Sequence, residues 1–172
     1  MLFKPDIYKK NIFSIDYNKL KETGITCLIF DLDNTLGLLD NITVPIRTKI
    51  LVNKLRKDFK IFIISNNTKK RIFPYTNDLE VEGLSSSLKP LTKSLRKVKR
   101  KYGFKKEEMA IIGDQLVTDI LCGKLYHIKT ILVDPLGKKD LKITGFNRWL
   151  EKRIINRYQR KGVFERGKYY EW

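Results

Sequence analysis

Four short apolar runs recur along the chain, and each has the length of a strand. They are ITCLIF (25–30), KIFIIS (60–65), MAIIG (109–113) and TILVD (130–134). Apolar and polar residues do not alternate within them, which is typical of parallel strands buried on both faces. Residues 45–57, 90–102 and 116–125 show helical spacing instead, and the first of these places Ile46, Ile50 and Leu55 near one face. This alternation predicts a doubly wound α/β fold with a parallel sheet.

The length of 172 residues most simply makes one domain. A further helix is expected before the first strand, with Asp16 as its N-cap and Gly24 just beyond its end. We expect the domain to span residues 1–162, with a basic amphipathic helix at about 144–162. The tail, residues 163–172, is too short and mixed to assign, and disorder is one interpretation of it.

Polar residues follow three of the four predicted strands. Asp31 follows the first, Ser65 and Asn66 the second, and Asp114 the third. Because parallel α/β sheets bind ligands beyond the carboxyl ends of their strands, we expect these side chains to share one crevice. The alternative for FDLDNT (30–35) alone is a turn, since Asp and Asn commonly break strands. A turn there does not account for the other polar strand ends.

This set of residues could hydrolyse a phosphate ester. Asp31 could attack phosphorus, and Asp33 could protonate the leaving alkoxide and then take a proton from water. Mg²⁺ would offset the repulsion between phosphate and carboxylates. Asp31, the backbone carbonyl of Asp33 and Asp114 could bind the ion, and Asp119 could anchor its water shell or position a cation.

Donors for the phosphoryl oxygens are also present. Ser65 with the amides after it could bind one oxygen and Lys89 another, and we count Asn66 and Thr35 as candidate substrate-binding residues. Taken alone, Lys89 is better interpreted as one solvated lysine among many. His127 is the only histidine, which disfavours a Ser–His–Asp triad.

Together these motifs resemble the haloacid dehalogenase-like (HAD) phosphatase superfamily. Its pattern of DxDxT, a strand-ending Ser or Thr, a Lys and GDxxxxD is present as residues 31–35, Ser65, Lys89 and residues 113–119. The segments FDLDNTL, ISNNT, LKP, GDQLVTDI and TGFNRW look like the YqeG group of small bacterial phosphatases, over about residues 5–162. That group is similar to mitochondrial phosphatases that dephosphorylate phosphatidylglycerophosphate.

The resemblance implies specific roles. Asp31 would be the nucleophile that forms an aspartyl-phosphate, Asp33 the acid/base, Ser65 and Lys89 phosphate ligands, and Asp114 a metal ligand. It implies a metal-site role for Asp119 less firmly, and a loop-shaping role for Thr35. Only 29 residues separate Thr35 from Ser65 and 23 separate Ser65 from Lys89, which leaves no room for a cap domain. An uncovered site suits a large substrate, such as a phospholipid phosphate or the end of a nucleic acid.

The basic and aromatic residues indicate which kinds of partner the protein could bind. The net charge of +17 should attract polyanions but does not choose among them. Residues 89–106 hold nine Lys/Arg and no acid, and a solvated helix face is the alternative to a binding face. The helix at 144–162 carries an apolar stripe that could pack in the core or contact anionic lipid. The stripe comprises Phe146, Trp149, Leu150, Ile154 and Tyr158.

The sequence thus predicts a capless, Mg²⁺-dependent phosphomonoesterase acting on a phospholipid phosphate such as phosphatidylglycerophosphate. One alternative is a phosphatase for nucleic-acid ends or nucleotides, and another is a non-catalytic basic protein that binds nucleic acid or the ribosome. No signal peptide or membrane-spanning run is visible, so we expect a cytoplasmic protein, with a peripheral position at the inner membrane face as an extension of the lipid hypothesis. Cys27 and Cys122 are expected to be buried, reduced thiols.

Overall fold

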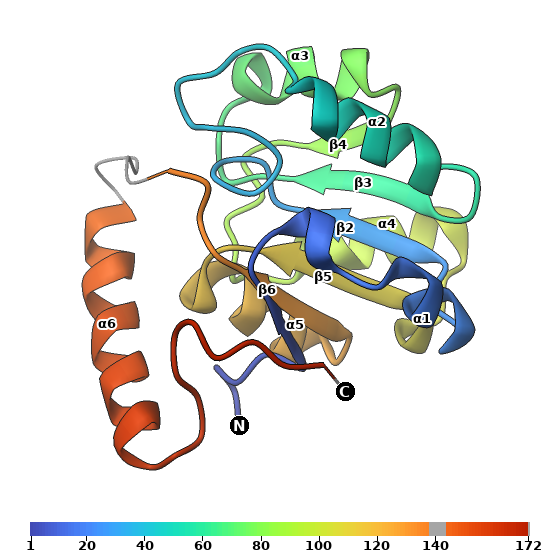
Figure 1. The fold of residues 1–172 in the computed structure, drawn as a ribbon. Helices are drawn as coiled ribbons and strands as arrows, with labels where there is room; N and C mark the ends of the chain where they lie inside the picture. Colours follow the sequence, from blue (N-terminus) through green and yellow to red (C-terminus); the bar gives the residue numbers. More distant parts are fainter. Residues whose placement is uncertain (138–143, 172) are drawn as a thin grey trace.

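The computed structural model describes residues 1–137 and 144–171. Its centre is a six-stranded sheet with the order β1-β6-β5-β2-β3-β4, and all of these neighbouring strands pair in parallel (Figure 1). The strands are β1 (Ile7–Lys9), β2 (Cys27–Phe30), β3 (Lys60–Ile64), β4 (Glu82–Leu84), β5 (Met109–Gly113) and β6 (Lys129–Val133). The helices are α1 (Tyr17–Glu22), α2 (Ile46–Leu55), α3 (Lys69–Asp78), α4 (Lys93–Tyr102), α5 (Leu121–Tyr126) and α6 (Thr144–Arg160).

Alternate residues of each central strand enter two separate cores. Leu28 and Phe30 of β2 pack in the cluster that contains the buried residues of α1, α2 and α3. Cys27 and Ile29 pack in the cluster that contains those of α4 and α5. Since both faces of β2 are covered, an unbroken apolar run is what this strand requires. The predicted doubly wound parallel sheet is confirmed, and Cys27 and Cys122 are both buried and free.

The four predicted strands are present, and two edge strands were missed. β1 and β4 have only three residues each, too few for a periodicity to show. Of the predicted helices, residues 45–57 correspond to α2, but its inner face differs from the expected one. Ile46 and Ile50 are exposed. The face toward the core instead carries Thr48, whose hydroxyl donates to the Leu36 carbonyl at 3.0 Å, followed by Val52. Hydrophobic periodicity does not detect a buried polar residue such as Thr48, whose hydroxyl is hydrogen-bonded.

The other predicted helices shift at their ends. α1 has Asp16 as its N-cap, whose side chain accepts from the Lys19 amide, as expected. α4 begins at Lys93 rather than at Pro90. Residues 116–125 are divided between a π-helical turn, η3 (Leu116–Ile120), and α5. The stretches between residues 35 and 65 and between 65 and 89 hold α2, α3 and β4 with their loops, and no inserted cap.

The C-terminal part of the chain stands beside the sheet and returns to it (Figure 1). Ile154, Ile155 and Tyr158 of α6 pack against a cluster from β1, η3 and β6. The sequence leaves disorder as one interpretation of the tail, but in the structure Phe164 is buried and Tyr170 pairs with Tyr8 of β1. The side chain of Phe146, part of the predicted stripe, lies outside the described residues. Among the described residues, no helix is both long enough and apolar enough to cross a bilayer.

Candidate active site

Three loops at the carboxyl edge of the sheet carry the predicted polar residues. Asp31 follows β2, Ser65 follows β3 and Asp114 follows β5, and these strands are neighbours in the order β5-β2-β3. The Asp31 amide donates to the Ile112 carbonyl at 2.8 Å, which extends the ladder between β2 and β5 to the site itself. The first carboxylate is therefore placed by the most central pairing of the sheet.

Asp31, Asp114 and Asp119 form a carboxylate cluster, to which each contributes an oxygen within 4.8 Å of the others. Asp119 lies on η3 and reaches back toward β5. Gly113 makes this approach possible, because a Cβ at that position would lie 2.3 Å from the Asp119 carboxylate. Three carboxylates that converge in this way are a donor set that suits a hard divalent cation. The residues present therefore fit the expected metal site.

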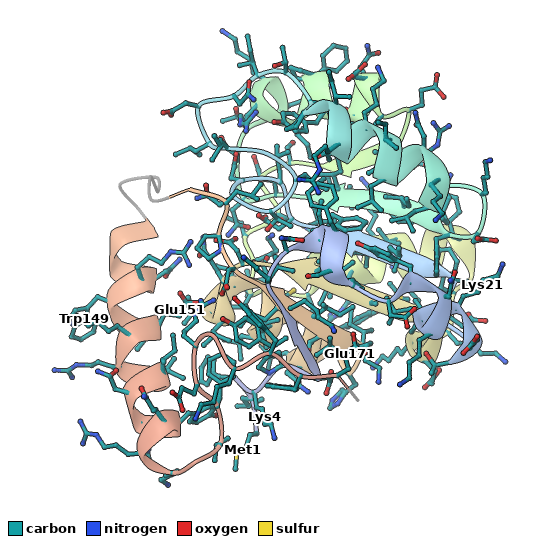
Figure 2. The ribbon with its side chains drawn as sticks, in the orientation of Figure 1. Met1, Lys4, Lys21, Trp149, Glu151 and Glu171 are labelled. Carbon is teal, nitrogen blue, oxygen red and sulfur yellow. The ribbon has the colours of Figure 1, made fainter. Side chains whose placement is uncertain are left out.

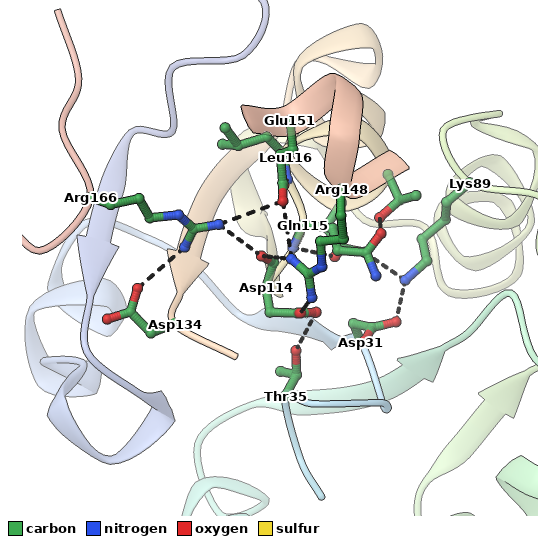
Figure 3. A network of polar contacts seen from close by, with 12 residues as sticks. Asp31, Thr35, Lys89, Asp114, Gln115, Leu116, Asp134, Arg148, Glu151 and Arg166 are labelled. Carbon is green, nitrogen blue, oxygen red and sulfur yellow. Dashed lines mark hydrogen bonds and ion pairs between the residues drawn. The ribbon is translucent and has the colours of Figure 1, made fainter. Parts of the chain in front are cut away.

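Lys89 joins two members of the cluster. Its Nζ donates to Asp31 Oδ1 at 2.5 Å and to Asp119 Oδ1 at 2.6 Å (Figure 3). Burial alone would lower the pKa of Lys89, but the two carboxylates outweigh it and raise that pKa above its ordinary value. Burial raises the pKa of Asp31 well above its usual range, although Lys89 opposes the shift. Lys89 is thus a buried ammonium group rather than a solvated surface lysine.

Asn66 holds the segment that carries Lys89. Its Oδ1 accepts from the Lys89 amide at 2.6 Å and from Ser87 Oγ at 2.9 Å, and its Nδ2 donates to the Lys89 carbonyl at 3.1 Å. Ser65 is buried, and its Oγ accepts from the Asn67 amide at 3.0 Å. The side chain of Asn66 therefore supports the Lys89 backbone, whereas the sequence predicts that it binds substrate.

Asp33 lies outside the carboxylate cluster. Arg71 Nε donates to Asp33 Oδ1 at 2.9 Å, and Asn67 Nδ2 donates to Oδ2 at 3.2 Å. The Asp33 side chain is 16 % exposed and the Asp31 side chain 11 %, so the two carboxylates differ mainly in their partners. The two carboxylates of the DxD motif, two residues apart, thus occupy different environments.

Asp114 is contacted from two sides. Thr35 Oγ1 donates to Oδ1 at 3.4 Å, and Arg148 Nη2 of α6 donates to Oδ2 at 2.5 Å (Figure 3). Burial raises the pKa of Asp114 to about 7, against the pull of the Arg148 guanidinium. Sequence reasoning found Thr35 and Asp114 but missed Arg148 and Arg71. Arg71 lies three residues after ISNNT and Arg148 lies within TGFNRW, so both are in or near segments that carry the resemblance, although the spacing alone assigns neither to the site.

Comparisons with known proteins identify the family of this chain. A family model described as HAD-hydrolase-like matches residues 88–142. The chain is 38% identical over 161 residues to the "Probable phosphatase YqeG" of Bacillus subtilis, covering 93% of this chain and 94% of that protein. The chain belongs to the HAD-like phosphatase family. The predicted resemblance and the assignment as a phosphatase are confirmed.

Two further similarities are more distant. Over 170 residues the chain is 25% identical to "Phosphatidylglycerophosphate phosphatase 1, chloroplastic/mitochondrial" of Arabidopsis thaliana, covering 92% of this chain but only 49% of that protein. The cobalt-bound form of the deoxy-D-mannose-octulosonate 8-phosphate phosphatase of Haemophilus influenzae superposes with a TM-score of 0.52 at 19% identity, over 84% of this chain and 95% of that one. At 19% identity this match supports the HAD fold and nothing beyond it.

Proposed function

We propose that this HAD-like phosphatase is a Mg²⁺-dependent phosphomonoesterase that forms an aspartyl-phosphate on Asp31. The observation that carries the proposal is the environment of Asp31 at the end of β2. Its carboxylate contacts the Lys89 ammonium at 2.5 Å and lies within 4.8 Å of Asp114 and Asp119. A nucleophilic carboxylate can attack a phosphate dianion only where fixed positive charge offsets the repulsion between them.

Two carboxylates divide the chemistry. A carboxylate oxygen of Asp31 attacks phosphorus while the bond from phosphorus to the ester oxygen breaks, and Asp33 gives its proton to the departing alkoxide. Water then attacks phosphorus, Asp33 takes a proton from it, and the bond to Asp31 breaks to release inorganic phosphate. The partly exposed Asp33 can exchange its proton with solvent between turnovers. Lys89 and Ser65 would bind the phosphoryl oxygens.

The carboxylates of Asp31, Asp114 and Asp119 would hold the cation, together with the backbone carbonyl of Asp33. When bound, the cation supplies positive charge at the phosphoryl group. Mg²⁺ suits this set because it accepts a few protein oxygens and keeps several waters.

The substrate that we propose is a phospholipid phosphate such as phosphatidylglycerophosphate. The name of the plant relative supports this class, and so do the uncapped site and the outer face of α6. Trp149 points away from the body of the molecule and keeps half of its surface exposed (Figure 2). Exposed basic residues accompany it on the same helix, as expected for contact with an anionic headgroup layer. They are Lys152, Arg153, Arg157 and Arg160. We further propose that the protein lies in the cytoplasm, peripheral to the inner face of the membrane.

The nucleophile is tested by Asp31→Asn. Since burial already disfavours the Asp31 charge, the variant should keep its fold while losing turnover of a generic aryl phosphate. Asp40→Asn, in the exposed loop before α2, is the matched control and should retain full turnover. Melting curves establish folding in both. Residual turnover in Asp31→Asn comparable to that of the native protein would refute the assignment.

The substrate class is tested by comparing three phosphomonoesters. A lipid phosphomonoester in mixed micelles should be hydrolysed with a higher kcat/KM than its soluble glycerol-based headgroup or a 3′- or 5′-phosphorylated oligonucleotide. Trp149→Ser should lower binding to anionic vesicles and the rate on the lipid, whereas Phe73→Ser, which removes an exposed aromatic of α3, should not. If the protein prefers the oligonucleotide and does not bind vesicles, the proposed lipid substrate is wrong and the end of a nucleic acid takes its place.

A further inference from the structure

A guanidinium group from α6 is built into the edge of the carboxylate cluster. Arg148 Nη2 donates to Asp114 Oδ2 at 2.5 Å, and Arg148 Nη1 donates to the Asp114 backbone carbonyl at 3.4 Å (Figure 3). One planar group thus contacts both the side chain and the main chain of the residue after β5. The arginine comes from a segment 34 residues further along the chain.

Glu151, one turn beyond Arg148 on α6, holds the guanidinium in place. Its Oε2 accepts from Arg148 Nη1 at 3.0 Å, and its Oε1 accepts a hydrogen bond from the Leu116 amide at the start of η3. Arg166 of the tail adds a second guanidinium, 3.7 Å from Glu151 Oε2 and 3.5 Å from the Asp114 carbonyl. Figure 2 shows Glu151 directed toward the body of the protein, and its side chain is buried.

This network is not needed to attach α6. Ile154, Ile155 and Tyr158 already pack the helix against the cluster around Tyr8. Withdrawing charged groups from water costs several kcal/mol per ion, so apolar contacts would serve a purely structural purpose more cheaply. Glu151 is buried and the Arg148 side chain is only 22 % exposed, so an ion pair so largely withdrawn from water calls for a role beyond docking.

The orientation of the Asp114 carboxylate supplies that role. Side chains that ligate metals are commonly fixed by a second contact, and removing such contacts weakens metal affinity about 10–100-fold. Arg148 occupies Oδ2, while Oδ1 is the oxygen near Thr35 Oγ1, at 3.4 Å. With Oδ2 bound by the guanidinium, Oδ1 would be the oxygen that ligates a cation, with Thr35 Oγ1 beside it.

We propose that Arg148 is a positioning residue for the metal site, which fixes Asp114 through Oδ2 and is itself fixed by Glu151. The inference rests on the proposed function, because it requires a cation at the carboxylate cluster. It makes α6 a component of the active site. It also assigns Arg148 no contact with the substrate.

The test separates geometry from charge. Removing Arg148 alone would change the charge beside the cation, so two variants that conserve net charge are used. Arg148→Lys keeps the charge but loses the planar fork that contacts two oxygens at once. The double variant Arg148→Gln/Glu151→Gln removes one charge of each sign, while Gln can still accept from the Leu116 amide. The matched control is Glu165→Gln/Lys168→Gln, which removes an exposed ion pair with the same spacing.

Titration calorimetry with Mg²⁺ at pH 8 should show about 10–100-fold weaker binding in Arg148→Lys and in the Arg148/Glu151 double variant. The control should bind as the native protein does. Turnover of an aryl phosphate should return when Mg²⁺ is raised in proportion to the lost affinity, which a general loss of structure would not allow. Melting curves establish whether each variant is folded. If the double variant unfolds, the Mg²⁺ affinity of Arg148→Lys alone decides the test.

Native-like Mg²⁺ affinity in Arg148→Lys would overturn the inference, as would tighter binding in it. In that case Arg148 would be an ion-pair partner without influence on the metal site. If the native protein itself binds no divalent cation, the proposed metal-dependent function fails instead. The two failures are therefore distinguishable in one set of titrations.

Discussion

Replacing Lys89 by Met should destabilise the metal-free protein, because the lysine separates two buried carboxylates. Met fills a similar volume, so the change mainly removes the charge. An oxygen of Asp31 and one of Asp119 lie within 4.8 Å of each other. At an effective dielectric constant of about 20, unit charges at this distance repel by about 3.5 kcal/mol. This agrees with the roughly 3–5 kcal/mol that is typical for removing one partner of a buried ion pair.

A loss of about 3–5 kcal/mol corresponds to a fall in Tm of roughly 6–20 °C for a chain of this length. Calorimetric melts at pH 8 in chelator would measure it, with Lys97→Met on the exposed face of α4 as control. Mg²⁺ should raise the Tm of Lys89→Met more than that of the native protein, since the cation replaces the missing positive charge. An equal loss with and without Mg²⁺ would mean that Lys89 contributes packing rather than charge.

The pH dependence gives a second check on the same variant. The pKa of Asp31 is raised above its usual value in the folded protein, chiefly by burial, and loss of Lys89 removes the main opposing effect. A carboxyl whose pKa is raised on folding binds its proton more tightly in the folded state, so stability falls as pH rises from the unfolded pKa toward the folded one. The deficit of Lys89→Met should therefore shrink toward pH 4. A deficit that is constant between pH 4 and pH 8 would refute the electrostatic argument.

Three further outcomes are expected. Mg²⁺ affinity, measured by calorimetry, should weaken as pH falls below about 7. Burial raises the pKa of Asp114 to about 7, and this carboxyl must lose its proton to bind the ion. An affinity that is constant from pH 8 to pH 6 would contradict this. Ca²⁺ should inhibit turnover in the presence of Mg²⁺, since its longer bonds and larger ligand number would misplace Asp31. Asp33→Asn should release about one nitrophenol per protein from nitrophenyl phosphate in a rapid burst, because a good leaving group needs no acid. Later turnover should be about 10²–10⁴-fold slower than in the native protein, because the water that attacks the intermediate still needs a base. A linear time course at the native rate would exclude Asp33 as the base.

The sequence was informative where a residue's role is local to a strand end. Asp31, Ser65 and Asp114 each follow an apolar run directly, so the rule for parallel sheets was enough to predict that they share one edge. The same reasoning failed for short edge strands such as β1, which exists mainly because it pairs with β6 and with Tyr170. Pairing of this kind depends on residues far along the chain, and no local pattern encodes it.

Side-chain partners within the site were less accessible to prediction. The sequence predicts that Asn66 contacts the substrate, but its side-chain amide binds the backbone amide and carbonyl of Lys89. The backbone groups of this loop are near a buried ammonium group, and buried polar groups need hydrogen-bond partners. Arg148 lies in TGFNRW, one of the segments that carry the family resemblance, but the sequence assigned it no role in the site. Its contact with Asp114 depends on how α6 packs against η3, which composition and spacing do not determine.

The geometry of α6 keeps the two proposals that involve this helix independent. Consecutive residues of an α-helix point about 100° apart, so Arg148 directed at Asp114 leaves Trp149 directed outward, where Arg153 lies over its ring at 4.5 Å. Trp149→Ser leaves the contacts of Arg148 and Glu151 in place, and Arg148→Lys leaves the outer face intact. Loss of vesicle binding with native Mg²⁺ affinity, and the reverse, are therefore separate results. A variant that lost both would point to undocking of α6 as a whole, because the two faces share only the helix backbone.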